Sequence, residues 1–371
     1  MRYIIYAGVK GKSDRCGIHS FSYDSGTHMF VWLRREDKLR GFTHLALSEK
    51  GLVLEATGKD DQHEDIMVGY TIDPRNGALT RSGAVRLDTS NDVCHLDISN
   101  DGTTAVVTDF INKGIHVWSL DSKGAPVAFL GRVPFSGSST SYRQGSTHLH
   151  SAFFSNDDNY ILVSDLGANR VWSVCWKRPS NEFVTVSEWK GRDGVGQRHV
   201  AMHPNGKYVY ALCEITAEIG VLELQADGEL REICMRSAMD QPLPDYNDQD
   251  INDIGLPDNY IAAGDIVVSP DGEYLFVSIR MIKELSVFKI MPNGDIFPVC
   301  FIHTEGTTRC MRVGVDAKTV FAFGEESSFT GGTGIIEVFE FDDVHGVMRR
   351  VAKEYVPGTF IGAILPDMCE V

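Results

Sequence analysis

The 371-residue sequence lacks several features that mark particular classes of protein. It has no uninterrupted run of about 18 apolar residues, which a membrane-spanning helix would require. The apolar part of its amino-terminal stretch, MRYIIYAGVKGK, is too short for a signal peptide. There is no Asn-x-Ser/Thr sequon, and the eight cysteines are scattered without a Cys-x-x-Cys pair. We therefore expect a cytoplasmic protein with reduced thiols that does not enter a membrane.

Basic residues are also scarce relative to acidic ones. The chain has 35 Lys and Arg against 51 Asp and Glu, a net charge of −16. Nucleic acid and anionic membrane surfaces would be repelled, so we exclude both as partners. A small anionic ligand stays compatible with this charge, because a few arginines in a closed channel reverse the local potential.

What the sequence does contain is a repeated pattern, clearest between residues 147 and 224. Each of two copies has a polar opening, an apolar strand, a turn, a second apolar strand, a polar break and a third strand. Tyr160 and Tyr208 occupy the same place in these two copies, 48 residues apart. A repeat of short strands near this period is typical of the blades of a β-propeller.

Six copies of this three-strand unit can be aligned along the chain, and its two ends supply a seventh. The units begin at His44, His95, His150, Arg198, Asp265 and Met311. Residues 3–8 resemble a second strand without a first, and residues 360–367 resemble a first strand without a second. Pairing these two segments would close the ring and remove an exposed sheet edge. The sequence predicts one all-β domain over residues 1–371, a seven-bladed β-propeller, with a long loop at about 237–260.

Charged residues recur at two equivalent places in consecutive units, ten residues before and six residues after the tyrosine position. The first place holds His150, Arg198 and, in the sixth unit, Arg309; the second holds Glu214, Arg280 and, in the sixth unit, Glu325. Most other units have small or apolar residues at both places. The strand nearest the axis lines the channel of a propeller, and blade ends meet there. We therefore predict that these residues form one site at the axis.

Each of these residues alone has an ordinary structural explanation. A charged residue after a strand is usually solvated, and a histidine such as His150 can be a hydrogen-bonded packing residue. The coincidence across units favours four catalytic residues: His150, Arg198, Glu214 and Arg280. We expect Arg198, Arg280 and Arg309 to bind the substrate, and we assign no role to Glu325.

Four other histidines lie near the starts of units without a matching pattern: His44, His95, His148 and His199. We interpret His148 and His199 as structural residues. His44 and His95 start their units and could face the channel, but the sequence identifies no partner for them.

The stretch RHVAMHPNGKYVYALCE (198–214), with LHSAFF (149–154) and YLFVSIR (274–280), resembles the lactonase family of seven-bladed propellers. Within it, the sequence is most similar to the fungal 3-carboxy-cis,cis-muconate lactonizing enzymes. The site proposed for those enzymes is one His, two Arg and one Glu. By motif, these fall on His150, Arg198, Arg280 and Glu214. The resemblance is strongest between residues 147 and 290.

These residue types suit lactonization, in which a carboxylate oxygen of a muconate adds to the substrate's own double bond. The nucleophile belongs to the substrate, so no serine or cysteine nucleophile is required. Arg198 and Arg280 would hold the polycarboxylate and stabilise developing enolate charge. Either Glu214 or His150 would donate the proton. A carboxyl between two arginines tends to stay ionised, which favours His150 as the acid with Glu214 as its partner.

We therefore predict a cycloisomerase, an intramolecular lyase of aromatic catabolism. Its substrate would be a small di- or tricarboxylate of the cis,cis-muconate type, 3-carboxy-cis,cis-muconate, and its product the muconolactone. We predict no cofactor and no metal, because two arginines in the channel would repel a calcium ion. A homo-oligomer is an expectation from the family.

Two other functions stay open at this point. A lactone hydrolase of the same fold, such as a 6-phosphogluconolactonase, would use the same residue types, with arginine binding a phosphate. The two functions differ in whether the lactone ring is formed or opened. A non-catalytic propeller could instead serve as an interaction platform. The sequence has no WD-type repeats, and their absence weakens the support for this third function.

Overall fold

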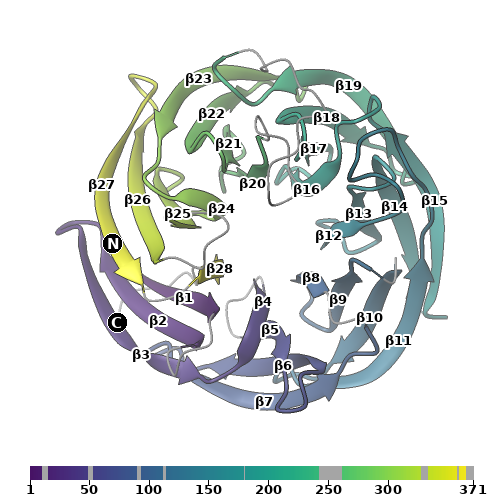
Figure 1. The fold of residues 1–371 in the computed structure, drawn as a ribbon, viewed down its shortest axis with the longest axis horizontal. Coiled ribbons are helices and arrows are strands. Elements are labelled where there is room, and N and C mark those ends of the chain that lie inside the picture. Colours follow the sequence, from purple (N-terminus) through teal and green to yellow (C-terminus); the bar gives the residue numbers. More distant parts are fainter. Residues whose placement is uncertain are drawn as a thin grey trace.

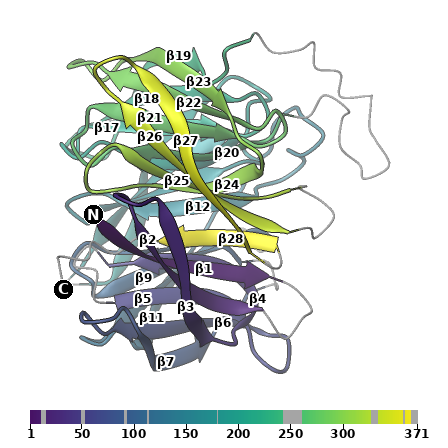
Figure 2. The same cartoon turned by 90° about the vertical axis from the view of Figure 1, so that its left-hand side faces the viewer.

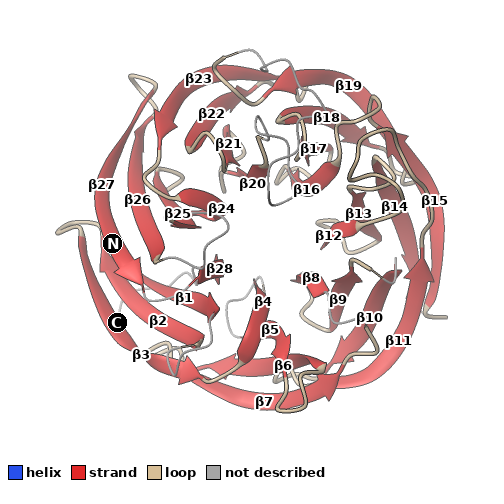
Figure 3. Ribbon diagram, viewed as in Figure 1, coloured by secondary structure: helices blue, strands red, loops and turns tan. Residues whose placement is uncertain are grey.

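The computed structural model describes residues 1–10, 16–48, 53–89, 93–111, 114–178, 180–241, 261–326, 333–356 and 359–364. These residues form 28 β-strands (Figure 3). Within these ranges there is no helix, and hence none of the length and apolar character that would cross a membrane.

The strands form seven four-stranded antiparallel sheets arranged as the blades of a ring (Figure 1). Blade 1 contains β4 (Arg40–Leu47), β5 (Val53–Lys59), β6 (Asp65–Ile72) and β7 (Leu79–Arg86). Blade 2 contains β8 (Val93–Ile98), β9 (Thr104–Asp109), β10 (Gly114–Leu120) and β11 (Pro126–Pro134). Blade 3 contains β12 (Leu149–Phe154), β13 (Tyr160–Asp165), β14 (Arg170–Lys177) and β15 (Glu182–Lys190). Blade 4 contains β16 (Gln197–Met202), β17 (Tyr208–Cys213), β18 (Glu218–Leu224) and β19 (Leu230–Ser237).

The remaining blades repeat this order. Blade 5 contains β20 (Ala263–Val268), β21 (Tyr274–Ile279), β22 (Glu284–Ile290) and β23 (Ile296–His303). Blade 6 contains β24 (Thr307–Val313), β25 (Thr319–Glu325), β26 (Gly334–Asp342) and β27 (Val347–Val356). Blade 7 contains β28 (Thr359–Ile364), β1 (Arg2–Lys10), β2 (Gly17–Asp24) and β3 (Met29–Asp37). The first strand of each blade lies nearest the axis, and the fourth forms the rim (Figure 1).

Blade 7 joins the two ends of the chain. Strand β28 pairs with β1 in antiparallel register, with Ala7 opposite Ala363, and the two lie side by side in Figure 2. This pairing covers the inner edge of β1, which would otherwise be open to another chain. The predicted seven-bladed propeller and its ring closure are confirmed.

Each blade has one strand more than the three-strand unit that we predicted. The fourth strands lie on the rim and are largely exposed, as in β15 and β19. Burial on the rim is too weak to impose a clear apolar alternation on their sequences. The predicted long loop at 237–260 lies outside the described residues from residue 242 onward.

The hydrophobic core is divided among the seven interfaces between neighbouring blades. Each of seven clusters of buried apolar side chains draws on two adjacent blades. Blade 7 contributes Tyr3 and Ile5 to the cluster with blade 6, and Ile4 and Tyr6 to the cluster with blade 1. Alternate residues of β1 therefore pack against blade 6 and blade 1, because successive side chains of a strand point to opposite faces of the sheet.

The tight turns between the first and second strands of blades 2 to 6 contain a residue with positive φ. Gly102, Gly206 and Gly272 close the turns of blades 2, 4 and 5 with φ angles of 74°, 71° and 75°. Asp158 and Ala317 adopt positive φ in blades 3 and 6, at the same place. Glycine takes this conformation without steric cost, which explains the Asp-Gly and Asn-Gly pairs of the repeat.

Candidate active site

A β-bulge near the start of the first strand directs the residues at the first predicted place. The pairing between the first two strands shifts register there in each of blades 1 to 6. In blades 3, 4 and 6 the residue at the shift is His150, Arg198 and Arg309. A bulge takes a residue out of the ladder and re-aims its side chain. All three line one cavity at the axis.

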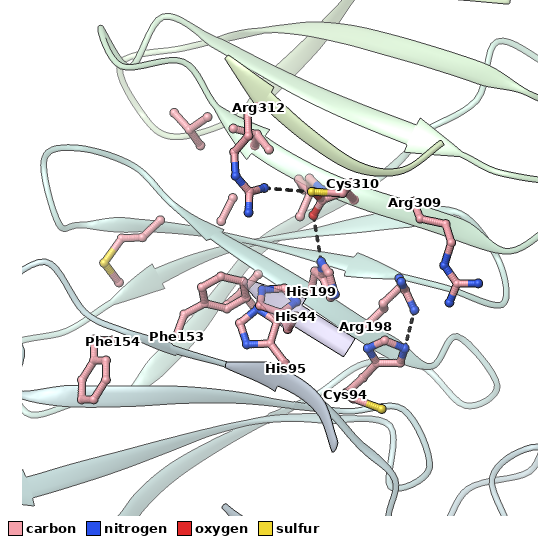
Figure 4. Close-up of a pocket in the computed structure, with 18 of the residues that line it drawn as sticks. His44, Cys94, His95, Phe153, Phe154, Arg198, His199, Arg309, Cys310 and Arg312 are labelled. Atoms are coloured by element: carbon pink, nitrogen blue, oxygen red, sulfur yellow. Dashed lines mark hydrogen bonds and ion pairs between the residues drawn. The ribbon is translucent and has the colours of Figure 1, made fainter. Parts of the chain in front are cut away.

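This cavity has a volume of about 460 Å³ and is lined by the first strands of blades 1 to 6 (Figure 4). Its charged and ring-bearing lining residues are His44, His95, His150, Phe153, Phe154, Arg198, His199, Asp265, Arg309 and Arg312. A space of this size holds a small-molecule ligand.

Glu214, at the second predicted place, lies at the centre of the charged residues. It directly follows β17, and only 1% of its surface is exposed. Its Oε2 lies 2.8 Å from Nη1 of Arg198, and its Oε1 lies 3.2 Å from Nη2 of Arg280. Nη1 of Arg198 also donates to Nε2 of His150, which lies 3.8 Å from Oε2 of Glu214. The structure therefore brings all four predicted catalytic residues together.

The guanidinium groups are held by backbone as well as by carboxylate. Nε of Arg198 donates to the carbonyl of Gly264 at 2.6 Å, which links blade 4 to blade 5. Nε of Arg280 donates to the carbonyl of Ala262 at 3.1 Å. Both arginines are therefore fixed before any ligand arrives, which lowers the ordering cost of binding.

The sequence reasoning missed one member of this cluster. Arg143, in the connection between β11 and β12, forms an ion pair with Oε1 of Glu214. Its side chain is 25% exposed. Since Arg143 lies outside the repeated unit, comparing equivalent places could not have found it.

Arg309 and Glu325 form a looser pair beside this cluster. Nη1 of Arg309 lies 3.9 Å from Oε1 of Glu325, and the arginine side chain is 31% exposed. Burial and the nearby charges of Arg280 and Arg198 lower the pKa of Arg309 to about 10. It still carries its charge at neutral pH.

The cluster also sets the protonation of its two other titratable residues. Burial by itself would raise the pKa of Glu214, but Arg143, Arg280 and Arg198 hold it well below the usual range. Burial and the charge of Arg198 keep the pKa of His150 well below its usual value. At neutral pH, Glu214 is therefore a carboxylate and His150 a neutral imidazole.

Four other histidines lie near the starts of the repeat units, and three of them, His44, His95 and His199, also line the cavity. The rings of His44 and His95 lie 4.2 Å apart between centroids, and that of His199 lies 5.5 Å from His95. His148 instead stacks on Phe110 at 4.6 Å, in line with its structural interpretation. Among the described residues, no three His, Cys, Asp or Glu side chains are placed to hold a metal ion.

The family model described as "Lactonase, 7-bladed beta-propeller" matches residues 4–361. The chain belongs to the lactonase family. One relative, the 6-phosphogluconolactonase of Bacillus subtilis (strain 168), is 26% identical over 307 residues, covering 82% of this chain and 83% of the relative.

Two solved lactonase structures share the fold. A putative 6-phosphogluconolactonase from Bacteroides fragilis NCTC 9343 superimposes with a TM-score of 0.82 and 21% identity, over 99% of this chain and 98% of that one. A periplasmic gluconolactonase from Pseudomonas aeruginosa superimposes with a TM-score of 0.83 and 19% identity, over the full length of both chains.

These relatives correct the predicted function. The predicted muconate-lactonizing function, with its assignment as an isomerase of aromatic catabolism, is wrong, because the Bacillus subtilis relative is by name a 6-phosphogluconolactonase, a lactone hydrolase. Both reactions build up negative charge on an oxygen, on an enolate in lactonization and on a tetrahedral intermediate in hydrolysis, and arginines can stabilise either charge. One His, two Arg and one Glu therefore do not determine which of the two reactions an enzyme catalyses. The alternative of a lactone hydrolase agrees better with the relatives.

Proposed function

We propose that this protein hydrolyses the lactone of a phosphorylated sugar acid, of the 6-phosphogluconolactone class. One observation carries the proposal: among the described residues, four arginines converge on two glutamates at the axial site, while the cavity's third carboxylate, Asp265, has Arg312 beside it. The arginines are Arg143, Arg198, Arg280 and Arg309, and the carboxylates are Glu214 and Glu325. The charges of these six groups sum to +2 in a protein whose net charge is −16, and a local positive charge of this kind favours an anionic ligand.

The arginines divide into two pairs by exposure. Arg198 and Arg280 are buried, with side chains 5% and 8% exposed. They suit the lactone carbonyl, whose oxygen gains negative charge in the tetrahedral transition state. Arg143 and Arg309 are 25% and 31% exposed, so they suit the phosphate, which stays hydrated on one side.

In this arrangement, water attacks the lactone carbonyl and the ring oxygen leaves. Glu214 keeps Arg198 and Arg280 in place, and its ionised, triply paired carboxylate is a poor proton acceptor. His150 already accepts a hydrogen bond at Nε2, so its proton is on Nδ1. This N–H is buried and has no hydrogen-bond partner among the described residues.

The test is hydrolysis of freshly prepared 6-phosphogluconolactone beside unphosphorylated δ-gluconolactone, each corrected for spontaneous opening. We expect a rate well above the spontaneous one and a larger kcat/KM for the phosphorylated lactone. A rate no higher than the spontaneous one with both lactones would overturn the hydrolase. Equal kcat/KM for both would overturn the assignment of a phosphate to the arginines. Arg231→Ala, at an exposed ion pair on the rim, is the matched control.

A further inference from the structure

His199 and Asp265 form a buried pair that none of the steps above uses. Nδ1 of His199 lies 2.8 Å from Oδ1 of Asp265, and the two come from the first strands of blades 4 and 5. The carboxylate also accepts the backbone N–H of Met311 at 2.8 Å and that of Ile266 at 3.0 Å. Arg312 lies 3.6 Å from its Oδ2. Asp265 is thus anchored from several sides.

These contacts decide which nitrogen of His199 carries the proton. The backbone donors and the histidine keep the pKa of Asp265 low against the effect of burial, so it is a carboxylate and can only accept. His199 must therefore donate from Nδ1. Its Nε2 then bears the lone pair, as in any histidine that a carboxylate orients through Nδ1.

The ring of His199 faces the axial cavity. It lines the same cavity as Arg198, and Figure 4 places it between that arginine and the His44–His95 pair. Its centroid is 5.5 Å from that of His150. Its side chain is 10% exposed, which leaves it reachable from the cavity.

The neighbouring candidates are less suited to accept a proton. Nε2 of His150 is occupied by the Arg198 N–H, and Glu214 is paired with three arginines. We propose that His199, oriented by Asp265, is the general base of the lactone hydrolysis. This inference rests on the hydrolytic function proposed above.

The step balances as follows. A water oxygen bonds to the lactone carbonyl carbon while one water proton passes to Nε2 of His199. The ester bond to the ring oxygen then breaks, and the leaving alkoxide takes that proton from His199. The ring opens to a hydroxy acid, which ionises and releases one proton. No oxidant, reductant or further reactant is required.

Several titratable or charged groups face His199 and act on its protonation. They are His44 from β4, His95 from β8, His150 from β12, Arg198 from β16, Glu214 at the end of β17, Asp265 from β20 and Arg312 from β24. Burial and Arg198 lower the pKa of His199, and Asp265 opposes them. Removal of the Asp265 charge therefore lowers that pKa further.

The test compares His199→Gln and Asp265→Asn with His345→Gln and Asp342→Asn. His345 and Asp342 make the same contact, Nδ1 to a carboxylate oxygen at 2.7 Å, but on the exposed surface of blade 6. We expect kcat on 6-phosphogluconolactone to fall about 10²–10⁴-fold in His199→Gln and to be unchanged in the surface pair. Because Asp265→Asn lowers the pKa of His199, it should move the acid limb of the pH profile of kcat to lower pH. Calorimetry with the product, 6-phosphogluconate, checks that each variant retains a folded site.

Each outcome bears on one proposal. Suppose that the wild-type protein hydrolyses the lactone, and that His199→Gln binds product with an unchanged kcat and an unchanged acid limb of the pH profile. His199 is then not the base, and the hydrolytic function stands. If wild-type protein does not hydrolyse the lactone, the function itself fails. Should His199→Gln not fold, the pH profile of Asp265→Asn decides: an unmoved acid limb overturns the inference.

Discussion

Glu214 and Arg280 form a 3.2 Å ion pair that connects the end of β17 in blade 4 to the end of β21 in blade 5. Arg198 shares the same carboxylate, so one buried charge holds two buried guanidinium groups. Glu214→Gln would leave these cations without a counter-charge. Breaking a buried pair costs about 3–5 kcal/mol of unfolding free energy, which we expect to measure in urea. Glu229→Gln, at an exposed pair, should change it by no more than about 1 kcal/mol.

Arg309 should contribute to substrate affinity more than to the chemical step. Its side chain is 31% exposed, and its nearest ion-pair partner, Glu325, is 3.9 Å away. We expect Arg309→Gln to raise KM for the phosphorylated lactone by about 10-fold or more, because a charge-assisted contact is worth roughly 1.5–3 kcal/mol. The value of kcat and the kinetics on the unphosphorylated lactone should change little. An equal loss on both lactones would contradict the assignment of the phosphate to this residue.

Gly264 occupies the bulge position of blade 5, where any side chain would collide with the site. A Cβ there would lie 2.4 Å from the carbonyl oxygen of Thr308 and 3.3 Å from Cγ of Arg280. The carbonyl of Gly264 also accepts the Arg198 N–H. We expect Gly264→Ala to shift both arginines and to lower kcat/KM by about 10²-fold. Gly145→Ala meets nothing within 4 Å and is the control; if both variants kept full activity, the close packing at Gly264 would not matter for the site.

Glu55 should make stability depend on pH. It is fully buried in blade 1, and neither of its carboxyl oxygens has a hydrogen-bond partner within the part of the chain that the structure describes. Burial and the charge of Asp121 raise its pKa well above the ordinary value. The folded protein therefore keeps a proton that the unfolded chain releases above about pH 4.3. This contribution to stability is present below that pH and is lost as the pH rises toward the folded pKa.

Substitution isolates this effect from that of the other carboxyl groups. We expect the difference in unfolding free energy, Glu55→Gln minus wild type, to increase from pH 5 to pH 8. Chemical denaturation of both proteins at the two pH values measures it. A difference that is the same at both would show that Glu55 ionises normally in the folded state.

The sequence was sufficient to predict the fold because the same pattern recurs in successive units, so each unit supports the interpretation of the others. Alternating apolar residues and a turn residue with positive φ recur in most blades, and each observation supports the others. The same equivalence of positions located His150, Arg198, Glu214 and Arg280. The rim strands escaped prediction because exposed strands carry little apolar alternation.

By itself, the sequence determined the propeller, its closure by the two chain ends and the equivalent places of the charged residues, because short-range periodicity encodes all three. Only the tertiary structure decided which of these side chains meet. It added Arg143, which lies outside the repeat, and it paired His199 with Asp265, 66 residues away on the next blade. Contacts between neighbouring blades depend on bulges and on how the blades pack around the ring, and neither leaves a local pattern in the chain.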